Sequence, residues 1–145
     1  MGKTNWSRVF LGGLMAGVVF FILGWAAYAV YLARLWGSAL EALGRPPSAM
    51  TFGAYVSTIV SALVLGILAV WLYSAIRPRY GAGARTAVCA GLAFWALLSL
   101  FPSLSLASMG LFSANLLVID CLSSLVMCIV GTLAGAWVYK EEQSR

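Results

Sequence analysis

Four long stretches without a charged side chain dominate this sequence and restrict what it can fold into. They cover residues 9–33, 46–76, 86–119 and 121–139 of a chain of 145 residues. A helix that crosses the hydrocarbon core of a bilayer needs about 20 predominantly apolar residues. Charged residues make up only 9% of the chain, against roughly 25% in an ordinary globular domain. The sequence therefore predicts an all-α integral membrane protein, with one four-helix transmembrane domain over residues 1–145.

We expect the spans at residues 8–34, 51–76, 85–105 and 112–139, and basic residues near the span ends predict their orientation. Only Arg34 and Arg45 fall on one side of the membrane. The other seven basic residues fall on the opposite side: Lys3, Arg8, Arg77, Arg79, Arg85, Lys140 and Arg145. Cytoplasmic loops carry an excess of Lys and Arg, so both termini and the 77–85 loop are predicted to be cytoplasmic.

The net charge of +5 indicates attraction to anionic lipid headgroups rather than a nucleic-acid interface. No stripe of basic residues follows one helical face, which a nucleic-acid-binding helix would need. The bilayer itself is thus the first predicted partner.

The segment 35–50 after the first span leaves two interpretations open. Apolar residues recur at helical spacing as far as Leu43, and Gly44 then precedes the breaker Arg45-Pro46-Pro47, which is a pattern typical of a helix end. One interpretation is a short amphipathic helix lying on the outer interface. The other is an extension of the first span, followed by a turn.

Every predicted span carries a pair of small residues four positions apart. Such pairs allow helix backbones to approach closely in lipid, so we expect them to pack against other helices. The motif does not reveal whether the partner helix belongs to this chain or to another protein. The pairs are Gly13 and Gly17, Ala62 and Gly66, Ala87 and Gly91, and Gly131 and Gly135.

Asp120 is the only acidic residue inside an apolar run, which makes it the default candidate for a functional polar group. It lies 20 residues before Lys140, or about 30 Å along a helix, and this distance predicts a position at the outer interface. There it would be a polar anchor in contact with water or headgroups. Two alternatives remain, an ion pair with Arg34 or Arg45 and a role in a proton relay.

Candidate catalytic and metal-binding groups are scarce. The chain contains no histidine, so a His-ligated metal, haem or chlorophyll is excluded within this chain. Cys89, Cys121 and Cys128 lie in apolar runs without a CxxC spacing and are expected to act as small apolar side chains. We therefore predict no enzyme activity and no cofactor held through histidine.

Pro102 lies near the predicted outer end of the third span. A proline removes one backbone hydrogen bond and bends or ends a helix. Two interpretations follow, a helix terminus and a broken helix that lines a cavity. In the second, uncharged polar side chains would form the lining: Ser99, Ser103, Ser105 and Asn115.

Four stretches, 5–9, 12–17, 71–79 and 132–139, resemble a family of small, uncharacterised four-span bacterial membrane proteins. This resemblance implies the same topology and a location in the bacterial inner membrane, and it implies no activity. The chain departs from that family around Gly24, since members often carry an acidic residue in the first span.

These observations favour a non-catalytic accessory or scaffold subunit of a larger membrane complex. A respiratory or photosynthetic electron-transfer assembly is one version, in which Trp25, Trp36 and Trp95 would contact lipid, pigments or quinone tails. The alternative is a small transporter or channel that forms a homo-oligomer, because four helices enclose little room for a pore within one copy.

Overall fold

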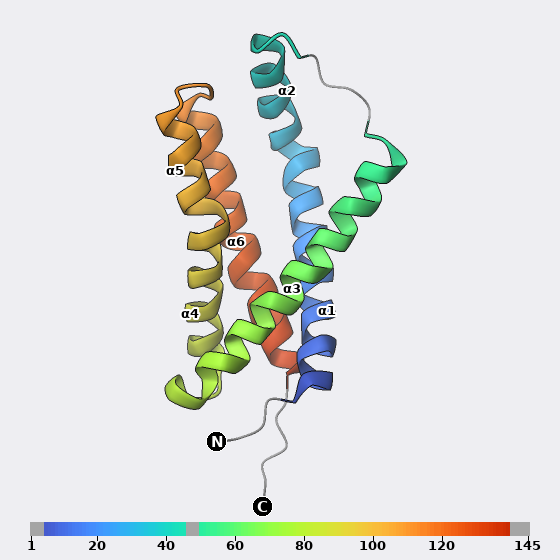
Figure 1. Ribbon diagram of the computed structural model, residues 1–145, viewed down its shortest axis with the longest axis vertical. Coiled ribbons are helices and arrows are strands. Elements are labelled where there is room, and N and C mark those ends of the chain that lie inside the picture. Colours follow the sequence, from blue (N-terminus) through green and yellow to red (C-terminus); the bar gives the residue numbers. More distant parts are fainter. Residues whose placement is uncertain (1–4, 46–49, 140–145) are drawn as a thin grey trace, which may run out of the picture.

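The computed structural model describes residues 5–45 and 50–139, and these form an all-α four-helix bundle (Figure 1). Within them, four continuous helical stretches are long and apolar enough to cross a membrane. These stretches are Trp6–Ala42, Phe52–Tyr80, Ala84–Ser108 and Ala114–Val138. The predicted fold class is therefore confirmed, and the chain has the features of a multi-pass membrane protein.

Two of the stretches contain a π-helical segment, where the backbone makes a wider turn. The first consists of α1 (Trp6–Ala27), η1 (Tyr28–Leu32) and α2 (Ala33–Ala42), and the third of α4 (Ala84–Trp95), η2 (Ala96–Leu100) and α5 (Phe101–Ser108). The second and fourth are the uninterrupted helices α3 (Phe52–Tyr80) and α6 (Ala114–Val138).

Side-chain caps begin three of the helices. Asn5 accepts a hydrogen bond from Arg8 N at the start of α1, Thr51 accepts from Ala54 N before α3, and Ser113 accepts from Leu116 N before α6. Each cap satisfies a backbone donor that the first turn leaves without a partner. Helices α2, α3 and α5 each end at a glycine with positive φ: Gly44 (φ 70°), Gly81 (φ 83°) and Gly110 (φ 67°).

The structure resolves the two interpretations of the segment after the first span. Helix α2 continues directly from η1 without a turn, so residues as far as Ala42 extend the first helix and do not form a separate helix on the interface. The first helix is thus eight residues longer than the predicted 8–34 span at its far end. No proline or glycine lies between Tyr28 and Leu35 to stop it.

The interpretation of Pro102 as a helix terminus is wrong, although the predicted end of the span at residue 105 lies three residues from the observed end. The third helix passes through this proline and ends at Ser108. The π-helical segment η2 ends at Leu100, two residues before Pro102. Because proline has no N–H group, a carbonyl in the preceding turn lacks its usual hydrogen-bond donor. The wider turn of η2 accommodates this loss, so the helix continues.

Helix α1 lies between α3 and α6, and α4 packs against α6. The beginning of α1 and the end of α6 lie at one end of the bundle, together with the α3–α4 turn (Figure 1). We call this the basic end, because Arg8, Arg77, Arg79 and Arg85 lie there; the other end carries α2 and the α5–α6 turn. Helix α3 crosses α1, and its beginning at Phe52 leans away from the other helices.

Candidate functional site

Small residues form the crossing of α1 and α3. A Cβ atom added to Gly17 would lie 2.6 Å from Leu63 Cα and 2.8 Å from the carbonyl oxygen of Ala62. A Cβ on Gly13 would lie 2.5 Å from Ile67 Cα, and one on Gly66 would overlap the backbones of Gly13 and Gly17. The predicted small-residue pairs of the first two spans therefore pack on each other.

The small residues of the last two helices also pack inside the bundle. A Cβ on Gly135 would lie 2.7 Å from the carbonyl oxygen of Gly12, and one on Gly131 would overlap the ring of Phe20 in α1. Gly91 in α4 faces the backbone of α6, where an added Cβ would lie 3.0 Å from Cys128 O. Ala87 is fully buried. These pairs hold the chain's own helices together and leave other surfaces for a partner.

Asp120 lies on α6, six residues after its first residue Ala114, or about 9 Å along the helix axis. The indole Nε1 of Trp36, on α2, donates a long hydrogen bond of 3.5 Å to Oδ1 of Asp120. The Trp36 ring also packs edge-on against Phe112, with ring centroids 5.3 Å apart. Asp120 and Phe112 together thus hold the extended first helix against the start of α6.

The arginines that the sequence offered as partners for Asp120 do not reach it. Arg34 and Arg45 are both exposed. Within residues 5–45 and 50–139, neither forms an ion pair with Asp120, and the polar contact of this carboxylate is the Trp36 indole. The reason is geometric, since the continuous helix turns Trp36 and not Arg34 toward α6.

Two serines next to Asp120 connect α6 to its neighbours. The hydroxyl groups of Ser123 and Tyr31 lie 2.7 Å apart, and those of Ser124 and Ser99 lie 2.5 Å apart. Trp95 Nε1 donates to the carbonyl oxygen of Cys121 over 2.9 Å. We refer to Asp120, Ser123 and Ser124 with their partners Tyr31, Trp36, Trp95 and Ser99 as the polar cluster.

Both π-helical segments supply a side chain to the polar cluster. Tyr31 belongs to η1 and Ser99 to η2, and each reaches one of the two adjacent serines of α6. A π-helical turn contains an extra residue and so changes the direction of the side chains around it. Ser99 was expected from the sequence to be a functional polar residue, whereas Tyr31 and Ser123 were not, because their pairing depends on this change of direction.

A cavity of about 480 Å³ lies beside the polar cluster between the first helix and α6. Asp120, Ser123 and Ser124 form its polar wall, and Leu23 and Leu32 are among its apolar residues. None of the four polar side chains expected at a broken third helix, Ser99, Ser103, Ser105 and Asn115, lines this cavity. Ser105 instead donates to the carbonyl oxygen of Phe101 in its own helix.

An apolar groove of about 540 Å³ separates α1 from the beginning of α3. Phe21 and Trp25 contribute from α1, and Tyr55 and Leu65 from α3. The serine and threonine residues that line it all lie on α3: Ser57, Thr58 and Ser61. This groove was not predicted from the sequence. Its signal is the recurrence of Gly53, Ser57 and Ser61 at the same four-residue spacing as the small-residue pairs of the spans.

No protein-family model, curated protein or solved structure matches this chain. The resemblance to small four-span bacterial membrane proteins therefore stays a prediction. The described residues also hold no group of three or more His, Cys, Asp or Glu side chains arranged to bind a metal.

Proposed function

We propose that this protein is a non-catalytic accessory or scaffold subunit of a larger integral membrane complex, and that a transmembrane helix of a partner protein occupies the groove between α1 and α3. The observation that carries this proposal is the position of α3. Between Ala62 and its beginning, this helix leaves the bundle (Figure 1), and its small residues Ser61, Ser57 and Gly53 have no close-packed partner helix in the described chain. At Gly53, an added Cβ would meet nothing within 4 Å.

The chemistry of the groove fits a helix better than a water-filled path. Helix contacts in lipid depend on small residues that allow close approach and on hydroxyl groups that bond across the interface. Ser57 and Thr58 both donate to the carbonyl oxygen of Ala54, so their oxygens keep lone pairs for an incoming donor. Trp25 and Tyr55 supply large apolar surfaces on opposite walls.

The polar cluster supports a structural role. Its hydroxyl and indole groups bond to one another, to Asp120 or to backbone carbonyls, and these bonds connect three helices. Asp120 is the only carboxylate in the described part of the cluster. A proton relay needs several titratable groups at depth, whereas interhelical hydrogen bonds stabilise a bundle with one.

The proposal includes a bacterial inner membrane with both termini in the cytoplasm. It is supported by four arginines at the basic end against Arg34 and Arg45 toward the other end, because cytoplasmic segments are enriched in Lys and Arg. A respiratory or photosynthetic complex is the specific version that we propose. Trp25 is 60% exposed beside the groove, where it would contact a partner helix, a quinone tail or a pigment.

A second candidate, a small oligomeric transporter or channel, is favoured by the cavity beside Asp120. The cavity combines a carboxylate and hydroxyl groups with apolar walls in the transmembrane part of the chain, as a substrate site would. In this case the protein would form a defined homo-oligomer, and no larger partner would copurify.

The test compares two matched variants after purification from native membranes in a mild detergent, with mass spectrometry of the intact assembly. Ser61→Phe places a ring in the groove, whereas Val60→Phe adds the same ring on the next residue, which is 51% exposed and does not line the groove. We expect larger partners in constant stoichiometry with the parent and Val60→Phe proteins, and their loss with Ser61→Phe. Equal recovery of partners with both variants, or a homo-oligomer alone, would contradict the proposal.

A further inference from the structure

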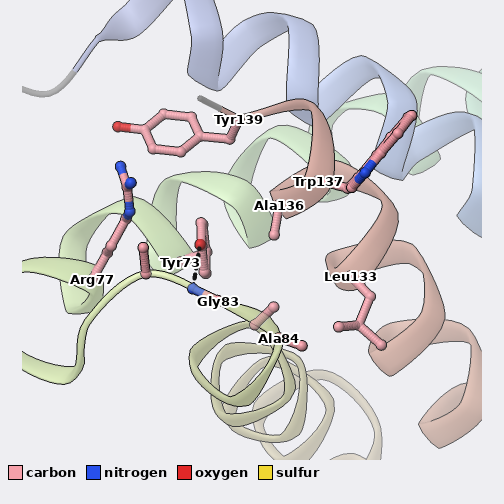
Figure 2. A pocket seen from close by; sticks show the side chains of 10 residues that line it. Tyr73, Arg77, Gly83, Ala84, Leu133, Ala136, Trp137 and Tyr139 are labelled. Carbon is pink, nitrogen blue, oxygen red and sulfur yellow. Dashed lines mark hydrogen bonds between the residues drawn. The ribbon is translucent and has the colours of Figure 1, made fainter. Parts of the chain in front are cut away.

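A third cavity, of about 630 Å³, opens at the basic end and is separate from both the groove and the polar cluster. It lies between the end of α3, the turn into α4 and the last residues of α6 (Figure 2). Figure 2 shows, around it, Arg77 and Tyr73 from α3, Gly83 from the turn and Ala84 at the start of α4, with Trp137 from α6 and Tyr139 directly after it.

A buried hydroxyl group on the cavity wall has an unused donor. Tyr73 is only 3% exposed, and its Oη accepts a hydrogen bond from Gly83 N over 3.3 Å. A phenol also carries one O–H donor, and this proton has no acceptor among residues 5–45 and 50–139. An acceptor atom inside the cavity would complete the hydrogen bonding of this side chain.

The other polar groups of the cavity also favour a negatively charged acceptor. The guanidinium of Arg77 lies 5.5 Å from the centre of the Tyr139 ring, which holds it at the cavity. The N-cap residue of α4 is Gly83, which provides no side-chain cap, so the first-turn N–H groups and the helix dipole of α4 face this region uncapped. No carboxylate is among the described residues that line the cavity.

The remaining wall is apolar and reaches the surface that faces lipid. Leu133, Ala136 and Trp137 form it on α6, and Trp137 is 79% exposed. Tryptophan at such a level is typical of the boundary between hydrocarbon and headgroups. A ligand that fits both walls carries an anionic group at one end and an acyl chain at the other.

We propose that this cavity binds an anionic phospholipid. The phosphate group accepts hydrogen bonds from Arg77 and from the O–H of Tyr73 near the start of α4, and one acyl chain lies along Leu133 and Trp137. Guanidinium groups and uncapped helix N-termini both recognise phosphate oxygens. Free phosphate shares this chemistry, but it would leave the apolar wall without contacts.

Lipid binding to the delipidated full-length protein tests this site. Native mass spectrometry would measure the affinity for phosphatidylglycerol and for phosphatidylcholine with the same acyl chains, with inorganic phosphate as a soluble competitor. We expect Arg77→Gln and Tyr73→Phe each to weaken phosphatidylglycerol binding by about tenfold, as the loss of a charge-assisted hydrogen bond predicts. The matched control is Arg79→Gln, which removes the same charge from an exposed residue that does not line the cavity.

Three results would overturn the proposal. The first is an equal loss of phosphatidylglycerol affinity in Arg77→Gln and Arg79→Gln. This would mean that the lipid is attracted by any positive charge of the protein and not by this cavity. The second is an equal affinity of the parent for the two lipids. The third is displacement of phosphatidylglycerol by millimolar inorganic phosphate, since it would identify free phosphate as the ligand. If Arg77→Gln fails to fold, Tyr73→Phe, which removes a single oxygen atom, decides the question. Lipid binding is measured without partner proteins, so its outcome is independent of the scaffold proposal.

Discussion

Replacing Gly17 with alanine directly tests the close approach of α1 and α3. The added methyl group would lie 2.6 Å from Leu63 Cα and 2.8 Å from Ala62 O, whereas apolar atoms make their best contacts at about 3.5 to 4.0 Å. Both obstacles are backbone atoms, which no change of side-chain rotamer can move. The helices must therefore separate by about 1 Å at their crossing, and a gap of this size removes a quarter to a half of the contact energy between facing atoms.

Gly24→Ala on the same helix is the matched control. Its methyl group would lie 3.4 Å from the sulfur atom of Met127, which is a flexible neighbour at an ordinary contact distance. Both substitutions gain the same helix propensity, about 1 kcal/mol, so this gain cancels when the two variants are compared. Overpacking of a well-packed interface costs about 1 to 3 kcal/mol. We thus expect Gly17→Ala to be about 2 kcal/mol less stable than Gly24→Ala.

Reversible unfolding in mixed micelles, with increasing dodecyl sulfate and tryptophan fluorescence as the signal, measures this difference. Circular dichroism in the same samples would show whether the helices themselves persist while their packing is lost. Equal free energies of unfolding for Gly17→Ala and Gly24→Ala would refute the argument, because they would mean that α1 and α3 do not approach closely in the membrane.

Two further predictions concern orientation and the polar cluster. Orientation is tested by cysteine labelling in a background in which the native cysteines are replaced. Ala82→Cys should react with a membrane-impermeant maleimide only from the cytoplasmic side, and Gly110→Cys only from the opposite side. The reverse pattern would contradict the predicted orientation. Asp120→Asn should lower the free energy of unfolding by at most about 1 kcal/mol, because the amide oxygen still accepts from Trp36 and no ion pair with Arg34 or Arg45 is lost. Abolished proton-coupled turnover in an intact assembly would instead assign Asp120 to a transport pathway.

Much of the architecture could be predicted from the sequence, because bilayer thickness and side-chain polarity act locally. The lack of charge over stretches such as 51–76 is enough to specify a membrane-spanning helix, and the number of such stretches specifies the bundle. Small residues such as Gly17 and Gly66 indicate close packing for an equally local reason, the absence of a bulky side chain. The ends were predicted less well, since Leu35 and Pro102 lie inside continuous helices.

Which groups meet was decided only by the tertiary structure. The sequence placed Asp120 near the outer end of its span but offered arginines as its partners, and the structure instead brings Trp36 to it. This pairing depends on the rotation of the first helix about its axis, which the π-helical segment η1 alters between Tyr28 and Leu32.

The groove beside α3 likewise depends on the angle at which this helix crosses α1. Lipid tails are as apolar as the side chains of a bundle interior, so an apolar residue such as Tyr55 has no local preference for protein over lipid. The hydrophobic pattern thus specifies that a helix spans the membrane without specifying which face packs inward. The mutual fit of Gly13, Gly17 and Gly66 sets the closest approach of α1 and α3, and the angle of that crossing leaves the beginning of α3 apart from the bundle.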